Sequence, residues 1–530
     1  PMRAVILVGL MGSGKSQVGA ALARRLGWRF VDTDAEIVAR EGRSIPAIFG
    51  ETGEARFRAV ESNVLRDVTR RAHAVIATGG GAVLSSANRR RMRRAGQVVY
   101  LEAPIDVLLQ RLGDDPGRPL LGDDPRTALE RLSRERAALY EEGSMVVDAA
   151  RPVDAVVDDI LLRLAALQRS VRVDLGDRAY DVAIGAGAMA LIGFDLARLG
   201  ARGRVAIVTH RRLVPRFGAR VAGALDGFGF ETTTLTVPEG ERAKSLRGAS
   251  ALIDALGAWG LDRSGTILAL GGGVIGDLAG FVAGTYMRGV RLVHVPTTLL
   301  AQIDSSIGGK AAVNHPRAKN LIGVFHQPAL VLADVDALGS LPARERRAGL
   351  AEAVKYAMVL DRGLLDLLER QPHTASGRSS PDDLHEVVFR CAALKARVVE
   401  DDELEQGPRE VLNYGHTVGH AVEAATPGRH IHGEAVAMGM RVEGQIARRL
   451  GLLSEEEAGR QDGLLAALGL PVSVPAGQID DLLDVMRLDK KRRDGRIRCT
   501  LPEGIGRARL GVEIPESLMR EVLRACQGSS

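Results

Sequence analysis

The stretch Gly9-Leu10-Met11-Gly12-Ser13-Gly14-Lys15-Ser16 follows directly on the apolar run Ala4-Val5-Ile6-Leu7-Val8. A glycine-rich turn between a strand and a helix can cradle phosphates with its backbone N–H groups, because no Cβ atoms intrude. In this motif the lysine reaches the β- and γ-phosphates, and the hydroxyl of the next residue ligates Mg²⁺. The stretch therefore predicts a nucleotide and Mg²⁺ site built from Gly12, Ser13, Gly14, Lys15 and Ser16.

A second glycine-rich stretch, Gly271-Gly272-Gly273-Val274-Ile275-Gly276-Asp277, follows the apolar run Thr266 to Leu270. Its spacing differs from the GxGxxG pattern. Three glycines directly after a strand still indicate that the backbone closely approaches the pyrophosphate of a dinucleotide. Two phosphate-handling stretches of different design in one chain favour two fused enzymes.

The composition is that of a globular protein with several domains. At about 150 residues per domain, a chain of this length allows three or four domains. The net charge of +5 is small beside 71 basic and 66 acidic residues, which argues against a dedicated nucleic-acid-binding protein but suits anionic substrates. The three cysteines form no CxxC pair and fit a reducing cytosol. No apolar stretch approaches the roughly 18 residues of a membrane span. We therefore expect a cytoplasmic protein without nucleic-acid or membrane partners.

The first third of the chain alternates short apolar strands with longer amphipathic helices, which predicts a parallel sheet with helices on both faces. The expected strands are Ala4–Val8, Val75–Ala77 and Val98–Leu101. The expected helices include Lys15–Leu26, Arg56–Arg70, Ile105–Arg111 and Asp154–Ala166.

The alternation returns beyond residue 170 and then gives way to helices. The expected strands are Val171–Leu175, Val205–Thr209, Glu231–Val237, Thr266–Leu270, Arg291–Val295 and Ala329–Ala333. Segment 372–381 is a loop by composition, and the expected helices are Ala343–Val359, Asp382–Glu400 and Ala435–Leu450. The pattern predicts an α/β protein in three parts: a P-loop kinase domain over residues 1–168, a Rossmann-like α/β domain over 169–340, and a mainly α-helical metal-binding domain over 341–530.

Acidic residues after the first loop indicate the acceptor side of a phosphoryl-transfer site. Val31-Asp32-Thr33-Asp34 ends a strand and puts two carboxylates on one side of it. Asp32 can support the metal and Asp34 can take the proton of an acceptor hydroxyl; alternatively, these residues only cap the helix that begins near Ala35. Four further segments complete the set: Phe57-Arg58, Gly79-Gly80-Gly81, Arg118-Pro119-Leu120-Leu121 and Arg136-x-x-Leu139-Tyr140.

With these segments in order, residues 2 to about 166 resemble shikimate kinase. The resemblance implies that shikimate is held by Asp34, Arg58, Gly80 and Arg136. It also implies that Arg118 belongs to a lid that closes over ATP and that Arg151 contacts the adenine. Lys15, Asp34 and Arg118 would be catalytic. Other small-molecule kinases, such as those for gluconate or adenylate, explain the loop but not this acceptor set.

Candidate metal ligands lie in the predicted helical part. Asn413-Tyr414-Gly415-His416-Thr417-Val418-Gly419-His420 puts two histidines at i and i+4 on one helix face, a spacing that by itself favours both as zinc ligands. His432 follows closely, and Glu352 lies in Leu350-Ala351-Glu352-Ala353-Val354-Lys355. A lone histidine is more often structural, but three histidines with a carboxylate favour a metal site.

Several further segments surround the second glycine stretch, and together they resemble 3-dehydroquinate synthase over residues 172 to about 515. These segments are Pro238 to Ser245, Gly284 to Gly289, Pro296 to Ser306, Gly308 to Lys310 and Lys319 to Gly323. The resemblance implies that Glu352, His416 and His432 bind Zn²⁺ or Co²⁺, whereas His420 stays off the metal and helps to bind substrate. The resemblance therefore excludes His420 as a metal ligand, whereas the i, i+4 spacing alone favours both His416 and His420.

The same resemblance assigns the remaining site residues. NAD would be contacted by Glu241, Lys244, Gly272, Gly273, Val274, Asp277, Thr297, Thr298, Asp304, Lys310 and Lys319. The sugar phosphate would be bound by Arg288, Lys310, Lys319, Asn320, Lys355, Lys395, Arg409, Asn413, His420 and Lys490. His420, Lys310 and Lys355 would be catalytic. Arg288 would reach the active site of a neighbouring subunit, which implies a homodimer.

The implied substrate is 3-deoxy-D-arabino-heptulosonate 7-phosphate, whose phosphate and carboxylate suit a set of lysines and arginines. NAD would be reduced and reoxidised within one turnover. Metal-dependent alcohol dehydrogenases and other sugar-phosphate cyclases are rival interpretations. The presence of Lys310, Asn320, Lys395 and Arg409 favours a substrate with a carboxylate. A non-catalytic scaffold is disfavoured because the expected catalytic residues are present in both halves.

Overall fold

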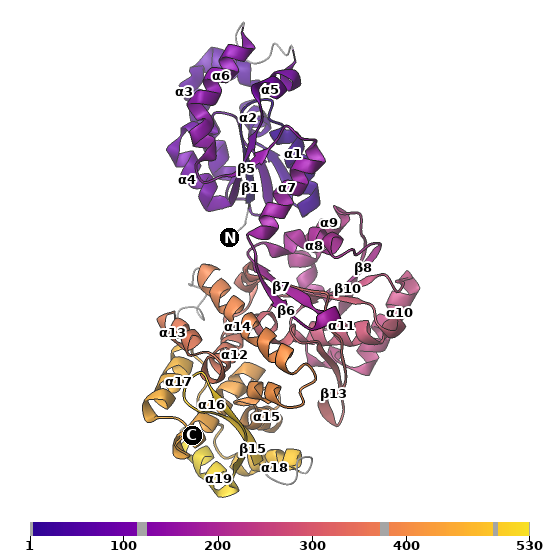
Figure 1. Cartoon of the computed structure of the whole chain (residues 1–530), viewed down its shortest axis with the longest axis vertical. Helices are drawn as coiled ribbons and strands as arrows, with labels where there is room; N and C mark the ends of the chain where they lie inside the picture. Colours follow the sequence, from indigo (N-terminus) through magenta and orange to yellow (C-terminus); the bar gives the residue numbers. More distant parts are fainter. Residues whose placement is uncertain (1–3, 114–123, 372–380, 491–496, 529–530) are drawn as a thin grey trace. The chain divides into compact units, whose positions relative to one another are not determined.

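The computed structural model describes residues 4–113, 124–371, 381–490 and 497–528 (Figure 1). These residues form two compact units. The first consists of residues 1–168, 186–203 and 215–232, and the second of residues 169–185, 204–214 and 233–530. Arg118 and most of the predicted loop 372–381 lie outside the described residues.

The first unit is built on a five-stranded parallel sheet, as its sequence predicts. The strand order is β2-β3-β1-β4-β5, and each neighbouring pair is parallel. The strands are β1 Ala4–Val8, β2 Arg29–Asp32, β3 Ala74–Ala77, β4 Gln97–Glu102 and β5 Met145–Asp148. Ala4, Ile6 and Val8 join one hydrophobic core, whereas Val5 and Leu7 join the other. Alternate residues of β1 therefore face opposite layers of helices.

The helices of this unit are α1 Lys15–Leu26, α2 Thr33–Glu41, α3 Ile45–Val68, α4 Ser86–Ala95, α5 Ile105–Leu112, α6 Pro125–Glu141 and α7 Val153–Ala166. Three of the four helices expected in this unit begin at or next to the expected residue, and the fourth, α3, begins earlier. Helix α1 matches its expected range. Helix α3 is longer than the expected Arg56–Arg70 and is kinked at Gly53, which has φ 78°.

Two helices from later in the sequence belong to the first unit. They are α8 Ile192–Arg198 and α9 Ala219–Asp226. Leu191 and Phe194 share a core with Leu26 of α1. At the end of α1, a Cβ on Gly27 would lie 2.6 Å from the backbone nitrogen of Ala224. Glycine therefore permits the close approach of α1 and α9.

The second unit contains a seven-stranded sheet of order β6-β7-β14-β11-β10-β8-β9. Five strands of this sheet run parallel to their neighbours, in the order β7-β14-β11-β10-β8. The edge strand β6 is antiparallel to β7. The strands are β6 Arg169–Val173, β7 Tyr180–Gly185, β8 Arg204–His210, β9 Glu231–Val237, β10 Thr266–Gly271, β11 Arg291–Pro296 and β14 Leu330–Asp334. Helices α10 Leu246–Trp259 and α11 Gly273–Thr285 complete this Rossmann-like part.

Two antiparallel hairpins also belong to the second unit. The first pairs β12 Lys310–His315 with β13 Ala318–Phe325, and the second pairs β15 Ile497–Pro502 with β16 Ala508–Ile514. Neither was expected from the sequence. The second hairpin lies within the part that was expected to be helical.

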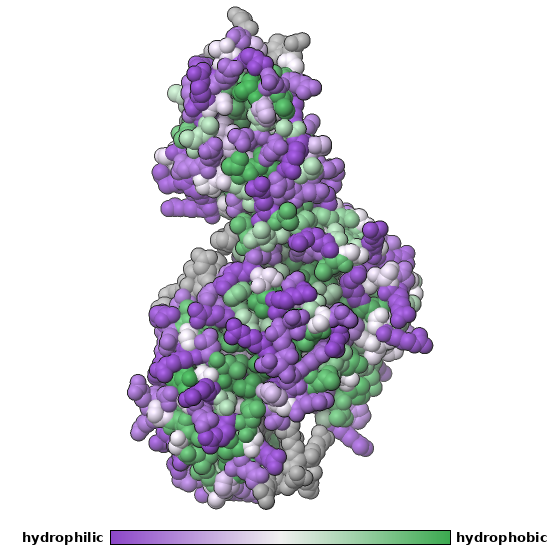
Figure 2. Space-filling model, viewed as in Figure 1, coloured by the Kyte–Doolittle hydropathy of each residue, from purple (hydrophilic) through white to green (hydrophobic). Residues whose placement is uncertain are grey.

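The remainder of the second unit is mainly helical, as predicted. Its helices are α12 Ala343–Val359, α13 Arg362–Arg370, α14 Pro381–Asp401, α15 His416–Ala425, α16 His432–Arg449, α17 Glu455–Ala467, α18 Ile479–Lys490 and α19 Glu516–Ala525. Within the described ranges, no helix is long and apolar enough to cross a bilayer. Hydrophilic residues occupy much of the visible surface of each unit, with hydrophobic residues between them (Figure 2).

Candidate functional sites in the two units

The phosphate-binding loop connects β1 to α1 and is shaped by glycines with positive φ. The φ angles are 145° at Gly9, 80° at Gly12 and 88° at Gly14. A Cβ on Gly9 would lie 2.7 Å from the carbonyl oxygen of Leu101, so this position requires glycine. The Nζ of Lys15 donates to the carbonyl oxygens of Gly9 and Leu10, at 2.9 and 2.8 Å. The lysine therefore already folds over the loop in which phosphates are expected.

The end of β2 supports this loop with a carboxylate. The hydroxyl of Ser16 donates to Oδ2 of Asp32 at 2.7 Å. The other oxygen of Asp32 accepts from the backbone N–H groups of Asp34 and Ala35, at 3.0 and 3.3 Å. Asp32 is thus the N-cap of α2 as well as the hydrogen-bond partner of the expected magnesium ligand, and its support of a metal stays a prediction.

The glycine triplet after β3 lies against the expected acceptor residues. A Cβ on Gly79 would lie 2.7 Å from both Oδ1 of Asp34 and Oε1 of Glu61. A Cβ on Gly81 would lie 2.1 Å from Nη1 of Arg58. Only residues without a Cβ allow these side chains to approach the loop so closely.

Two arginines lie against the glycine triplet. Arg58 pairs with Glu61 at 2.9 Å and with Glu54 at 3.1 Å. Arg136, which is only 5% exposed, donates to the carbonyl oxygen of Gly80 at 3.2 Å. Burial raises the pKa of the Glu61 carboxyl, although Arg58 opposes this effect. The structure therefore brings together Asp34, Arg58, Gly80 and Arg136, the four residues expected to hold shikimate.

Arg151 lies apart from this set at the start of α7. It pairs with Asp159 at 2.6 Å and is 40% exposed. No described contact links it to the loop residues named above, so its role at the adenine stays a prediction.

The second glycine stretch forms the junction of β10 and α11. A Cβ on Gly272 would lie 3.0 Å from Cγ2 of Thr298, and a Cβ on Gly273 would lie 3.2 Å from Oγ of Ser305. The backbone N–H of Thr297 donates to the carbonyl oxygen of Gly271 at 2.9 Å. The junction thus leaves a backbone surface at the carboxyl end of parallel strands, where nucleotides bind in such sheets.

A polar network connects this junction to the β12–β13 hairpin. Lys244 forms an ion pair with Asp277 of α11 and a hydrogen bond with Asn320 of β13. Asn314 donates to Oε1 of Glu241 at 2.8 Å and accepts from the backbone N–H of Asn320 at 2.9 Å. Expected NAD contacts and an expected substrate contact therefore share one network.

Three candidate metal ligands converge from three helices. Glu352 lies on α12, His416 begins α15 and His432 begins α16. Oε1 of Glu352 is 3.7 Å from Nε2 of His416 and 3.5 Å from Nε2 of His432. Glu352 is fully buried. This group has the three residues that the resemblance implies as ligands, and the choice between them and the i, i+4 pair stays a prediction.

His420 belongs to a second group with Glu423 and His432, whose ligand atoms also lie within 4.8 Å of one another. The His420 ring centroid is 5.2 Å from that of His416. His420 is exposed, whereas the first group has the buried Glu352 as its centre. The first group is therefore the better enclosed of the two.

The charges around the first group explain the pKa values of its members. Burial and Lys355 lower the pKa of His416 to about 3. Burial opposes protonation of His432, but Glu352 and Glu423 outweigh it and raise its pKa to about 10. Burial would raise the pKa of Glu352, yet Lys355 and the two histidines hold it well below its usual value.

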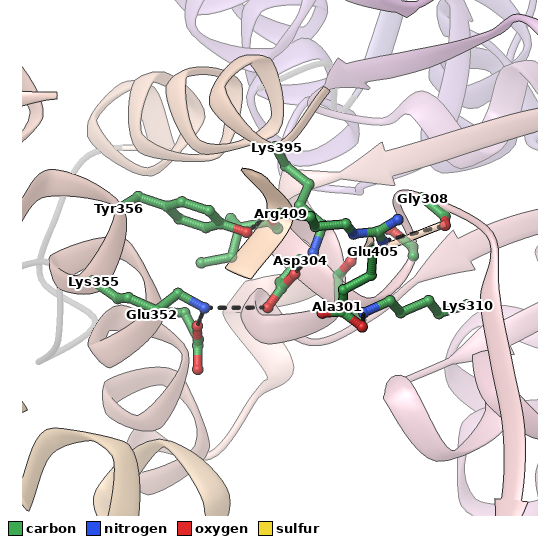
Figure 3. Close-up of polar contacts among 12 residues, drawn as sticks. Ala301, Asp304, Gly308, Lys310, Glu352, Lys355, Tyr356, Lys395, Glu405 and Arg409 are labelled. Atoms are coloured by element: carbon green, nitrogen blue, oxygen red, sulfur yellow. Dashed lines mark hydrogen bonds and ion pairs between the residues drawn. The ribbon is translucent and has the colours of Figure 1, made fainter. Parts of the chain in front are cut away.

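A row of alternating charges extends from this group (Figure 3). Asp304 pairs with Lys395 of α14 and lies 3.8 Å from Nζ of Lys355. Lys355 in turn pairs with Glu352. Burial would raise the pKa of Asp304, but Lys395 and Lys355 lower it to about 2. Burial lowers the pKa of Lys395 to about 8 despite its pairing with Asp304.

Two more expected substrate-binding cations, Lys310 and Arg409, lie next to Gly308 and Gly309. Lys310 pairs with Glu405. Arg409 is 1% exposed and donates to the carbonyl oxygens of Glu403, at 2.6 Å, and Gly308, at 3.3 Å. The structure thus gathers the expected cations Lys310, Lys355, Lys395 and Arg409 near the candidate metal ligands.

Three further residues are expected to contact the substrate: Arg288, Asn413 and Lys490. Arg288 is exposed and has φ 66° at the end of the helical turn that follows α11. Asn413 lies on the 3-10 turn just before His416. The side chain of Lys490, the last residue of α18, lies outside the described side chains.

Some polar residues at these sites were not singled out from the sequence. They are Glu61, Asn314, Glu405 and Glu423. Each is a single polar residue in an ordinary segment, so no local pattern distinguishes it. Glu405 has φ 57°, an unusual conformation for its type that only the structure reveals.

Family models match both halves of the chain. The shikimate kinase model matches residues 11–165. The models for the N-terminal and C-terminal parts of 3-dehydroquinate synthase match residues 234–348 and 349–492.

Curated relatives agree with the second assignment. The 3-dehydroquinate synthase of Gloeobacter violaceus is 47% identical over 352 residues, which is 66% of this chain and 97% of the relative. That of Nostoc punctiforme is 44% identical over 357 residues, covering 67% of this chain and 98% of the relative.

Solved structures share the fold of the same region. One is 2-epi-5-epi-valiolone synthase from Streptomyces hygroscopicus with NAD⁺ and Zn²⁺ bound, at 32% identity and a TM-score of 0.61, covering 66% of this chain and 96% of that one. Another is 2-deoxy-scyllo-inosose synthase complexed with carbaglucose-6-phosphate, NAD⁺ and Co²⁺, at 28% identity and a TM-score of 0.61, covering 68% of this chain and all of that one. The chain therefore belongs to the 3-dehydroquinate synthase family and carries a shikimate kinase domain before the synthase, as a bifunctional enzyme of the shikimate pathway.

Proposed function

We propose that the kinase domain transfers the γ-phosphoryl group of ATP to shikimate, giving shikimate 3-phosphate and ADP. The observation that carries this proposal is the meeting of the Lys15 loop with Asp34, Arg58 and Arg136 around the glycine triplet. Mg²⁺, when bound at Ser16, supplies positive charge between the β- and γ-phosphates.

The kinase residues then have distinct tasks. Arg58 and Arg136 hold the carboxylate of shikimate, for which their planar guanidinium groups are suited. Asp34 accepts the proton of the hydroxyl that is phosphorylated. Asp32 orients Ser16 through the 2.7 Å hydrogen bond.

We propose that the synthase half converts 3-deoxy-D-arabino-heptulosonate 7-phosphate into 3-dehydroquinate and phosphate. Glu352, His416 and His432 offer one oxygen and two nitrogen donors, which fits Zn²⁺ or Co²⁺. The glycine junction of β10 and α11 fits the pyrophosphate of NAD. When bound, NAD would supply the acceptor and donor of a hydride, and the metal would supply positive charge at the substrate hydroxyl.

The residues of the chain bind and orient the substrate in this proposal. Lys355 and Lys395 lie beside Asp304, and the charge of Arg409 acts on Lys395; these three cations can bind the anionic groups of the sugar phosphate. Lys310 pairs with Glu405 and is near enough to Arg409 and Asp304 for their charges to act on it. His420 lies one turn from His416, where it can contact substrate without being a ligand in the first group.

A paired assay on the purified chain tests both proposals. We expect ADP formation that depends on shikimate, and phosphate release that depends on the heptulosonate phosphate. With a trace of NAD⁺, phosphate release should continue without a steady rise in NADH absorbance. NADH formation in proportion to product would show a dehydrogenase instead of a synthase.

A second candidate for the synthase half is cyclisation of a sugar phosphate that lacks a carboxylate, because two structural neighbours are other cyclases. The buried Arg409 and Lys395 favour the carboxylate-bearing substrate. Comparing kcat/KM for heptulose phosphates with and without the carboxylate decides between them.

We further propose that the chain acts in the cytoplasm as a homodimer formed through its synthase half. The proposed boundaries are residues 1–168 for the kinase domain, 169–340 for the NAD-binding domain and 341–530 for the metal domain.

Light scattering tests the homodimer, because it measures the mass of the protein in solution. Loss of synthase activity in Arg288→Ala without loss of bound NAD would support a contribution of Arg288 to the neighbouring site.

A further inference from the structure

Glu423 lies on the same face of α15 as the two histidines. Positions 416, 420 and 423 are related by i, i+4 and i+7, which places their side chains in one row. Oε2 of Glu423 lies 3.0 Å from Nδ1 of His432. The carboxylate is half-buried, with 17% of the side chain exposed.

The other carboxylate oxygen has a partner from a different element. Nζ of Lys319, on β13, lies 3.5 Å from Oε1 of Glu423. Both oxygens are therefore engaged, one by the histidine and one by the lysine. These contacts limit the rotation of the carboxylate in front of His432.

The two nitrogens of His432 face different groups. Nδ1 faces Glu423, whereas Nε2 faces Oε1 of Glu352 at 3.5 Å. An imidazole can bind a metal through Nε2 only if the proton resides on Nδ1. A carboxylate that accepts from Nδ1 selects this tautomer, fixes the ring orientation and makes the ring a better donor.

His416 has a comparable arrangement with a different acceptor. Its Nδ1 lies 3.2 Å from the carbonyl oxygen of Tyr414, and its Nε2 points to Glu352. Both candidate ligands are thus oriented through Nδ1, one by a backbone carbonyl and the other by Glu423.

We propose that Glu423 is a positioning residue that holds His432 in the Nε2-coordinating tautomer and orientation, and is not itself a metal ligand. The proposal rests on Glu352, His416 and His432 being the metal ligands. The competing arrangement uses His420, Glu423 and His432 as ligands. It lacks the fully buried Glu352, and in it Glu423 would bind the metal and not serve as the acceptor that faces Nδ1 of His432.

The test measures Zn²⁺ affinity of the full chain by competition with a chromophoric chelator. Glu423→Met keeps the volume but removes the acceptor, and we expect its affinity to fall roughly 10- to 100-fold. Glu423→Gln keeps an oxygen that can accept from Nδ1, so its affinity should stay within a few-fold of wild type. Glu434→Gln is a matched control, because Glu434 is a similarly exposed carboxylate nearby that pairs with Arg344.

A second measurement separates positioning from general structural damage. The ¹⁵N spectrum of His432 in the zinc-loaded chain should show Nδ1 protonated and Nε2 metal-bound in wild type and Glu423→Gln. Wild-type affinity in Glu423→Met would overturn the proposal. Equal losses in Glu423→Met and Glu423→Gln would also overturn it, in favour of Glu423 as a ligand.

Glu352→Ala is included to test the underlying ligand set separately. Zinc loss in this variant supports that set, whatever Glu423 does. Retention of zinc in Glu352→Ala together with loss in Glu423→Gln would transfer the site to the second group. If Glu423→Met fails to fold, the comparison of Glu423→Gln with wild type still decides between acceptor and ligand.

Discussion

At the scale of single residues, the absence of one Cβ controls the kinase acceptor site. Asp34 and Glu61 both approach the position that a Cβ on Gly79 would occupy, at 2.7 Å. We expect Gly79→Ala to displace these carboxylates and to lower kinase kcat roughly 100-fold, because a misplacement of about 1 Å has effects of this size. Gly50→Ala is the matched control, since nothing lies within 4 Å of its Cβ position. Wild-type kinase turnover in Gly79→Ala would contradict the argument.

The low pKa of Lys395 predicts a pH effect on substrate binding. Burial lowers this pKa to about 8, so the lysine loses its positive charge as the pH rises through 8. The substrate phosphate is already doubly ionised there. We expect KM for the heptulosonate phosphate to rise by up to about tenfold per pH unit above 8. Lys395→Arg keeps its charge, and its KM should stay level over the same range.

The metal set gives a third prediction at this scale. Replacing Glu352, His416 or His432 by Ala should deplete zinc, because each removes one converging donor. His420→Ala should keep the metal but lose synthase activity. Metal analysis of the four purified variants decides this, and zinc loss in His420→Ala would restore the i, i+4 reading.

Motifs predicted residues that the structure brings together, such as Lys15 and Asp32, whereas Glu61 and Glu423 belong to no motif and were not singled out from the sequence. Gly9 to Ser16 has a fixed spacing because the phosphate contacts are local in sequence. Only the tertiary structure brings Glu61 of α3 close to Gly79 and Glu423 of α15 close to Lys319. Their distance from those partners is therefore absent from any local pattern.

At the scale of elements, a buried carboxylate secures the helix that carries the histidines. Glu443 of α16 accepts from the backbone N–H groups of Gly415, at 2.6 Å, and Val418, at 3.1 Å. These are N–H groups of the first turn of α15, which have no partner within the helix. The contact therefore joins the start of α15, where His416 lies, to the interior of α16, the helix that His432 begins.

Removing this carboxylate should loosen α15. Glu443→Ala leaves buried donors unsatisfied, at a cost of about 2 kcal/mol. We expect amide hydrogen exchange in residues 415–425 to become roughly 30-fold faster if exchange occurs by local opening. Glu443→Gln keeps an acceptor and should show a smaller change. The exposed Glu455, at the start of α17, offers a control replacement that should not alter exchange in α15.

Elements whose pattern is local were predicted from the sequence, and those that depend on pairing were not. Helix α12 and strand β9 match their expected ranges. The β12–β13 hairpin was missed because β13, with the sequence AKNLIGVF, has an exposed and irregular pattern. Its strands are defined by their register with each other.

At the scale of the whole molecule, the phosphate-binding loop lies entirely in the kinase domain. Lys15→Met should therefore abolish shikimate-dependent ADP formation and leave phosphate release by the synthase half unchanged. Both rates can be measured on one preparation. Equal loss of both activities in a folded variant would contradict the assignment of one activity to each half.

The sequence predicted one change along the chain and missed another. A change from strand–helix alternation to long helices was visible near residue 341, and the structure has a mainly helical part there. The sequence pattern did not predict that α8 and α9 belong to the first compact unit. Their place in this unit depends on shape, such as the absence of a side chain at Gly27 where Ala224 approaches.

Three lysines expected to bind the sugar phosphate already have carboxylate partners. The pairs are Lys310 with Glu405, Lys395 with Asp304, and Lys355 with Glu352. An arriving anion must therefore exchange one partner for another instead of neutralising a bare cation. Chloride or sulfate gains little from a single exchange, whereas a ligand with several anionic groups gains from several at once. These three ion pairs should consequently bind the small anions of the cell weakly. They should select among larger ligands by the number and spacing of the ligand's negative charges.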